Sequence, residues 1–248
     1  MILFVLEGER PDLRLYKSMM EACGVAGDTV AAVYGCNIDA LYHEMKDLGE
    51  GADIVDVLRM KYQDDESSPF KGVSRSDQFS EIYLIFDYDF HDVNRSPEEL
   101  NNQLSYLLSF FDEETEHGKL YINYPMIESI RYTKELPDPY YYHYSVSREE
   151  CRSFKQISAA FSYYSNMSFL LGGNAEKRAK NWELLKIQNV AKANYICNGE
   201  NSFPPAEKES ISQNNILQHQ ICDYESQSGC LVSVLSSFPL LMYDWLGR

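Results

Sequence analysis

Short apolar runs alternate with amphipathic segments along the first half of the chain, and this alternation constrains the fold more than any other feature of the sequence. Each run has the length and near-continuous hydrophobicity of a buried strand, and the segments between the runs repeat apolar residues at helical spacing. We therefore predict an α/β fold with a largely parallel sheet flanked by helices. The predicted strands lie at 2–6 (ILFVL), 28–35 (DTVAAVYG), 81–86 (EIYLIF) and 119–125 (KLYINYP).

The segments between these runs begin and end at residues typical of helix boundaries. Gly24 and Gly49 follow two of them, at the position where a glycine commonly ends a helix. Ser96 precedes the last of them, and Pro97 and Glu99 complete the arrangement of a capping box. The predicted helices lie at 12–23, 38–49, 52–62 and 96–111, and the polar segment 63–78 is predicted to be a loop.

The pattern changes after the first half, where helical spacing dominates. We predict one amphipathic helix at 147–167 and a second at 174–196. The apolar stretch 230–247 contains Ser and Pro and is too short and broken to span a bilayer, which indicates a buried strand or helix.

The length of 248 residues allows one large domain or two small ones with a proper core. A hydrophobic content of 44% is typical of a folded globular protein. We predict an α/β catalytic domain at 1–134, with an insertion at about 52–78, and a mainly helical C-terminal region at 135–248.

The formal net charge of −16 argues against broad adhesion to nucleic acid or anionic membranes, but leaves a local basic groove open. The start, MILFVLEGERPD, has no basic segment before its short apolar run, so we expect no signal peptide. Six cysteines without a CxxC pair suit a reducing compartment. We therefore expect a cytoplasmic protein that does not act at a membrane.

Carboxylates follow two of the predicted strands. Glu7 ends the first run, and Asp87 and Asp89 stand two apart at the end of a later one. Ligand sites of parallel sheets gather at the carboxyl ends of strands, so these side chains converge if the two strands are adjacent. Like charges at close range repel unless a cation lies among them, and carboxylate oxygens suit Mg²⁺ or Mn²⁺. We predict a metal site for phosphodiester chemistry.

A glutamate after the first strand and a DxD after a later one resemble the signature of the Toprim domain, which is built on a Rossmann-like sheet. The segment ILFVLEGERPDLRLYKSM is most similar to stand-alone Toprim nucleases of bacterial anti-phage systems: the PARIS effector, AbiL and RloB-like proteins, and OLD-related nucleases. The resemblance covers about residues 1–130. It implies that Glu7 is a general acid/base or metal ligand and that Asp87 and Asp89 are metal ligands. It also implies that Glu9 is either an auxiliary ligand or only the start of a helix.

The resemblance also implies a function. We expect a Mg²⁺-dependent endonuclease that acts as a toxic effector, cleaves RNA (tRNA in particular) in preference to DNA, and is regulated by an ATPase partner; a homodimer is compatible with this expectation. Two features depart from the family pattern. Asp92 stands where many Toprim domains have a small residue, and the 52–78 region lengthens the gap between the two motifs.

Other polar side chains are weaker candidates. Glu128 either reaches the acidic cluster or caps a helix, and His91 either moves a proton or is an ordinary surface residue. The acidic run at 112–116 is most simply a solvated turn. The most basic face of a predicted helix consists of Lys177, Arg178, Lys180 and Lys186. This face either contacts a nucleic-acid backbone or is an ordinary helix surface exposed to solvent.

Two further groups of residues have a functional and a structural interpretation. The tyrosines at 140–144 stack unpaired bases or, more simply, pack the two halves of the chain together. The second group consists of Cys197, His219, Cys222 and Cys230. Its functional interpretation is a zinc site, and its structural interpretation is a set of buried thiols in the core.

Two alternatives to a nuclease remain open. The first is a non-catalytic or DNA-directed Toprim subunit that serves as an interaction module of an ATPase complex, which the acidic surface supports. The second is a receiver-like or phosphatase-like fold in which Asp87 is phosphorylated. It ranks last because no lysine stands in a matching downstream strand.

Overall fold

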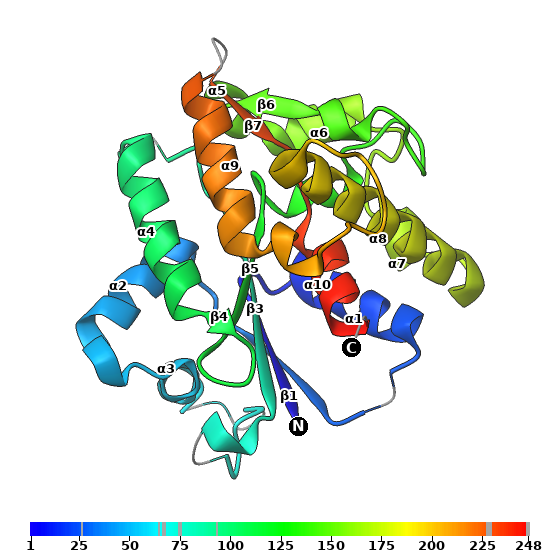
Figure 1. Ribbon diagram of the computed structural model, residues 1–248. Coiled ribbons are helices and arrows are strands. Elements are labelled where there is room, and N and C mark those ends of the chain that lie inside the picture. The colour runs from blue at the N-terminus through cyan, green and yellow to red at the C-terminus, as the bar shows by residue number, and fades with distance from the viewer. Residues whose placement is uncertain are drawn as a thin grey trace.

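The computed structural model describes residues 1–25, 27–63, 65, 68–73, 76–92, 94–226 and 230–246. Five strands form one sheet in the order β2-β1-β3-β5-β4 (Figure 1). The first four are parallel neighbours, and β4 pairs antiparallel with β5 at the edge. The strands are β1 (Ile2–Leu6), β2 (Thr29–Val33), β3 (Glu81–Asp87), β4 (Asp112–Glu113) and β5 (Gly118–Asn123). The prediction of a largely parallel α/β sheet is confirmed; β4 was not predicted and lies in the acidic run.

Helices cover both faces of this sheet. α1 (Pro11–Cys23) packs with α8 (Ala175–Asn198) and α10 (Ser237–Leu246) on one face, and α2 (Ile38–Leu48) packs with α4 (Pro97–Phe110) on the other (Figure 1). The first crossover leads from β1 to β2 and the next returns past β1 to β3, so right-handed connections put their helices on opposite faces. The direction of winding therefore reverses between β1 and β3, which makes their carboxyl ends the switch point where ligands bind in such sheets.

The predicted helix boundaries are confirmed in the first half. Gly24 ends α1 in the left-handed conformation with a φ of 66°. The hydroxyl of Ser96 accepts the backbone N–H of Glu99 at 3.1 Å, and the Glu99 carboxylate accepts the backbone N–H of Ser96 at 2.7 Å, which completes the capping box of α4. Asp53 caps α3 (Ile54–Lys61) through the backbone N–H of Val55.

The predicted single helix at 147–167 is wrong. The segment forms α5 (Arg148–Cys151) and α6 (Phe154–Phe161), and α7 (Ser168–Leu171) follows it. The chain turns after α5 so that Cys151 and Phe154 both enter a small core around Tyr132. α6 ends after Phe161, where the backbone leaves helical pairing and the N–H of Tyr163 donates to the carbonyl of Thr133 at 2.9 Å.

The C-terminal region is mainly helical, as predicted, and adds a second sheet. β6 (Ser145–Ser147) pairs antiparallel with β7 (Leu231–Ser233), and these strands were not predicted. The apolar stretch that begins at residue 230 contains both a buried strand, β7, and a buried helix, α10. The remaining elements are α9 (Gln213–Ser226) and the 3₁₀ helices η1 (Gly49–Gly51), η2 (Ser76–Gln78), η3 (Ile127–Arg131), η4 (Tyr141–His143) and η5 (Lys208–Ile211).

One hydrophobic core joins the two halves of the chain. Phe4 of β1 and Leu84 of β3 belong to the same buried cluster as Trp182 of α8 and Leu241 of α10, and all four are fully buried. The C-terminal helices therefore complete the face of the sheet that α1 leaves open. Among the described residues, no helix is both long and apolar enough to cross a membrane.

Candidate active site at the switch point

Glu7 and Asp87 lie side by side at the carboxyl ends of β1 and β3. The strands pair in parallel with Leu6 opposite Ile85, so Glu7 follows β1 beside the last residues of β3, which include Asp87. The backbone N–H of Glu7 donates to the carbonyl of Ile85 at 3.1 Å, and the backbone N–H of Asp87 donates to Glu7 Oε2 at 2.8 Å. The adjacency on which the sequence argument depended is therefore present.

The carboxylates at this point crowd one another in partly buried surroundings. Burial, and then the negative charge of Asp89, raise the pKa of Glu7 to about 8. Burial, and then the charge of Glu7, raise the pKa of Asp87 well above its usual range. Burial also raises the pKa of Asp89, although His91 opposes this shift. Carboxyl groups in such surroundings hold protons near neutral pH or take up a cation.

Asp12 joins this cluster, although the sequence did not single it out. It lies in the first turn of α1, is 4% exposed and accepts the backbone N–H of Gly8. Burial raises its pKa to about 6, and the charge of Glu128 adds to this. A Cβ atom on Gly8 would lie 2.7 Å from Asp12 Oδ2, so the close approach requires glycine. An acidic residue in the first turn of a helix is usually explained by its favourable interaction with the helix dipole, so the sequence provided no reason to assign Asp12 to the site.

Asn123, the last residue of β5, is a second residue that the sequence argument missed. Its side-chain amide donates to Asp87 Oδ1 at 3.0 Å. Its carbonyl oxygen accepts the backbone N–H of Ser237 at 2.9 Å and the Ser237 hydroxyl at 2.8 Å. The fully buried Asn123 thus fixes Asp87 to the start of α10. The strand-end rule that selected Asp87 applies equally to this residue.

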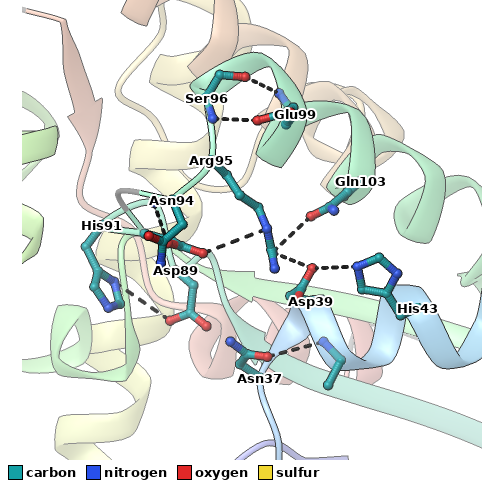
Figure 2. A network of polar contacts seen from close by, with 12 residues as sticks. Asn37, Asp39, His43, Asp89, His91, Asn94, Arg95, Ser96, Glu99 and Gln103 are labelled. Atoms are coloured by element: carbon teal, nitrogen blue, oxygen red, sulfur yellow. Dashed lines mark hydrogen bonds and ion pairs between the residues drawn. The ribbon is translucent and has the colours of Figure 1, made fainter.

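The loop after β3 carries Asp89 in an unusual backbone conformation. Asp89 has a φ of 51°, which few residues other than glycine adopt, and its side chain is 18% exposed. A hydrogen bond from Asn37, the residue before α2, stabilises its charged form. His91 Nδ1 lies 3.9 Å from Asp89 Oδ1 (Figure 2). Asp89 therefore links the loop after β3 to the start of α2.

Arg95 holds this loop against α2. Its guanidinium forms a close ion pair with Asp39 (Figure 2). Its Nε also lies 3.8 Å from Asp92 Oδ2. On the opposite side of Asp39, His43 Nε2 lies 3.3 Å from the same carboxylate. Asp92 also accepts the backbone N–H of Asn94 at 2.9 Å. The side chain of Asp92 thus contacts its own loop, while its backbone carbonyl accepts a hydrogen bond from Arg148 of α5.

A cleft of about 610 Å³ opens beside the cluster, between the loop after β1 and the end of β2. Glu7 and Glu9 both line it, and Tyr62 and Asp65 form the opposite wall. Glu9 is exposed, unlike Glu7. The cleft is large enough to hold a phosphate group and its neighbouring sugar beside Glu7.

Comparison with protein-family models, with curated proteins and with solved structures returned no match. The chemistry of the site has to be argued from its own residues.

The donor atoms of the cluster are of the type that a hard divalent cation prefers, since they are partly buried carboxylate oxygens with mutual repulsion. As the side chains lie, however, the described residues contain no group of three or more His, Cys, Asp or Glu side chains converged closely enough to hold a metal ion. Glu7 Oε2 and Asp87 Oδ1 instead accept hydrogen bonds from the protein. Binding a cation therefore requires at least one of these carboxylates to turn.

The helix face expected to bind nucleic acid lies on α8 and is partly occupied by ion pairs. Arg178 donates to Glu21 Oε2 and to the carbonyl of Gly173, each at 2.8 Å. Lys186 Nζ lies 2.7 Å from the Glu183 carboxylate. Lys177 and Lys180, the other two members of this face, are exposed.

The remaining candidates fall into separate positions. Glu128 on η3 is 8% exposed and borders the cluster through Asp12. Tyr141 is buried and donates its hydroxyl to Asn189 Oδ1 at 2.8 Å, so it packs η4 onto α8, while Tyr140 is 66% exposed. The four Cys and His residues considered for zinc form no metal-holding group within the described part of the chain.

Proposed function

We propose that this protein is a metal-dependent nuclease whose active centre is formed by Glu7, Asp87 and Asp89. The observation that carries this proposal is the convergence of Glu7 and Asp87 at the switch point of a parallel sheet, with Asp12 and Asp89 close enough to perturb their titration. The glutamate at the end of β1 and the DxD at the end of β3, on two adjacent parallel strands, support a Toprim-like site. Mg²⁺ or Mn²⁺ is the cation that such oxygen donors favour.

The surroundings of Glu7, Asp87 and Asp89 suit these residues to different roles in catalysis. A bound Mg²⁺ or Mn²⁺ would polarise a phosphoryl oxygen and lower the pKa of a coordinated water. Asp87 and Asp89 would hold the cation, and Asn123 orients Asp87 through its amide. Glu7, whose pKa is raised to about 8, holds a proton at neutral pH and is suited to give it to the leaving oxygen.

The biological role that we propose follows from the resemblance described above. The substrate is RNA, tRNA in preference to DNA, and the nuclease is a toxic effector of anti-phage defence that an ATPase partner restrains. The acidic surface, with a net charge of −16, is suited to an electropositive partner.

The test is cleavage by matched variants. Purified protein is incubated with labelled tRNA, single-stranded RNA and single-stranded DNA in Mg²⁺, Mn²⁺ or EDTA. Glu7→Gln and Asp87→Asn are expected to lose cleavage by a factor on the order of 10³, since each removes a group needed in the transition state. Glu98→Gln, an exposed acid on α4, is the control and is expected to cleave normally. Full activity in the two site variants, or in EDTA, rejects the proposal.

A second candidate function is favoured by one observation. Because the described residues hold no preformed group of three metal ligands, the chain also fits a non-catalytic interaction subunit with a vestigial site. Calorimetric titration with Mn²⁺ separates the two. Binding that Asp87→Asn abolishes supports the nuclease, whereas the absence of Mn²⁺ binding together with capture of an ATPase supports the interaction subunit.

A further inference from the structure

A second cleft, of about 490 Å³, lies at the start of α1 and is lined mainly by cationic side chains among its charged residues. Its walls come from the start of α1, from η3, from α6 and from the segment 166–172. Four cationic side chains line it against a single acidic one, Glu128, in a chain whose net charge is −16. The cations are Arg10, Arg14, Arg131 and Lys155, and we call this the basic cleft.

Two of these cations are free to meet a ligand. Arg10 and Arg14 are exposed, one helical turn apart on α1, and neither forms an ion pair or side-chain hydrogen bond with any residue that the structure describes. Lys155 is 75% exposed on its side chain, and its Nζ lies 4.0 Å from Glu128. Lys17, also exposed, continues the same face of α1.

Arg131 adds a fixed positive charge to the wall of the basic cleft. It is 6% exposed, and it is held by the carbonyls of Lys155 and Ser165 and by the hydroxyl of Ser158. Its Nε–H is buried and has no hydrogen-bond partner within the described part of the chain. The guanidinium therefore acts on an anion in the cleft through its charge.

The same two elements connect the basic cleft with the acidic cluster. α1 presents Asp12 to the cluster and Arg14 to the cleft. η3 donates the backbone N–H of Ile127 to Asp87 and carries Arg131 at its other end. A strand whose scissile phosphate is at Asp87 therefore has an electropositive surface available in the basic cleft.

We propose that the basic cleft binds the phosphodiester backbone of the nucleic-acid strand next to the scissile phosphate. This inference rests on the proposed nuclease function. The row from Arg10 to Lys17 extends about 10 Å along α1 at 1.5 Å per residue, which is longer than a single phosphate group. A backbone with repeated phosphates fits this row of charges better than a single phosphate ion does.

The experiment measures binding separately from cleavage. A fluorescein-labelled 15-nucleotide single-stranded RNA is titrated by anisotropy in EDTA and increasing KCl, in the Glu7→Gln background. The double variant R10Q/R14Q is expected to lower the slope of log affinity against log salt by about 1.4, from about 0.7 per phosphate contact, and to weaken binding about 20-fold at 0.1 M salt. The control K46Q/K71Q removes the same charge from exposed lysines elsewhere on the chain and is expected to leave the slope unchanged.

Three results overturn the inference. These are the absence of salt-dependent binding in the parent, an equal loss in the cleft and control variants, and a loss confined to a K177Q/K180Q variant of α8. Lys155→Gln is a second cleft variant on an exposed side chain, so a folding defect of R10Q/R14Q would not decide the question.

Failure of the inference and failure of the proposed function are distinguishable. If the parent with Glu7 intact cleaves RNA and R10Q/R14Q cleaves and binds equally well, the nuclease stands and the inference falls. If cleft-dependent binding occurs but no metal supports cleavage, the inference stands and the nuclease falls.

Discussion

The acidic cluster and the basic cleft are neighbours with opposite electrostatics and opposite construction. The acidic cluster consists of Glu7, Asp12, Asp87 and Asp89, which are largely withdrawn from solvent and set mainly by strand ends of one sheet. The basic cleft is more open, and its side chains come from helices and turns of both halves of the chain. The carboxylates of the cluster are therefore held in place and repel one another. The cleft instead has exposed side chains, and two of its cations, Arg10 and Arg14, form no ion pair with any residue that the structure describes.

This difference indicates a division of labour. Crowded carboxylates store unfavourable charge that a cation or protons must neutralise, which suits a site of chemistry. Exposed arginines are well solvated in the absence of a ligand and gain favourable electrostatic interactions when phosphates bind, which suits a site of binding. The predictions below separate these two properties, beginning with the largest expected effect.

The first prediction tests, by kinetics on RNA with Mn²⁺, whether the acidic cluster and the basic cleft have separate roles. Asp87→Asn is expected to lower kcat on the order of 10³-fold, or about 4 kcal/mol of barrier, with KM changed little. R10Q/R14Q is expected to raise KM about 20-fold and leave kcat within about threefold, because its contacts are present before and during the reaction. If both variants lower kcat equally, the two regions do not have separate roles.

The second prediction concerns the support beneath the acidic cluster. Asn123→Ala removes the partner of Asp87 Oδ1 and leaves the backbone N–H and hydroxyl of Ser237 unpaired in a fully buried position. We expect the free energy of unfolding to fall by about 2–4 kcal/mol in urea denaturation. Asn215→Ala, at an exposed position before the middle of α9, is the control and is expected to change it by less than about 1 kcal/mol. A small effect in Asn123→Ala would mean that Asp87 is not fixed by α10.

How far the sequence predicts the molecule follows from the same comparison. Strand ends are predictable because apolar runs fix the strands and parallel pairing fixes which residues meet, so Glu7 and Asp87 were found. Asp12 and Asn123 were missed although they obey local rules, because a first-turn acid and a strand-end amide each have an ordinary structural explanation. Burial, which only the tertiary fold supplies, distinguishes them.

The basic cleft was out of reach for a different reason. Arg14 and Arg131 are separated by more than a hundred residues, and no periodicity relates a helix of the first half to the turn at η3. The sequence instead favoured the compact cluster on α8, where contiguity along one helix stands out. That face includes Arg178, whose pairing with Glu21 depends on the packing of α8 against α1.

The third prediction uses the raised pKa of Glu7. Because the folded protein holds this proton up to about pH 8 while the unfolded chain releases it near 4.5, stability from this group is complete below pH 4.5 and is lost as the pH rises to 8. In EDTA, we expect Glu7→Gln to gain about 1–3 kcal/mol relative to the parent between pH 5 and 8. R10Q/R14Q is expected to follow the parent curve. Urea melts at several pH values measure this, and a pH-independent difference between Glu7→Gln and the parent contradicts it.

The smallest effect is expected where the backbone itself makes room for the cluster. Gly8→Ala places a Cβ atom 2.7 Å from Asp12 Oδ2 and 3.4 Å from its Cγ, so the carboxylate must rotate away from the backbone N–H that it accepts. We expect a loss of about 1 kcal/mol in stability and roughly threefold weaker Mn²⁺ binding by calorimetry. Gly51→Ala is the matched control, since no atom lies within 4 Å of its added Cβ.

RNA binding in EDTA makes this last prediction specific to one region. Gly8→Ala and Gly51→Ala are both expected to keep the parent's affinity and salt slope, because Arg10 and Arg14 stay exposed on α1 when Asp12 turns. A Gly8→Ala variant that loses RNA binding as well as Mn²⁺ binding would show that the start of α1 couples the two regions. The acidic cluster and the basic cleft would then be one site, with Gly8 and Asp12 setting the orientation of the arginines.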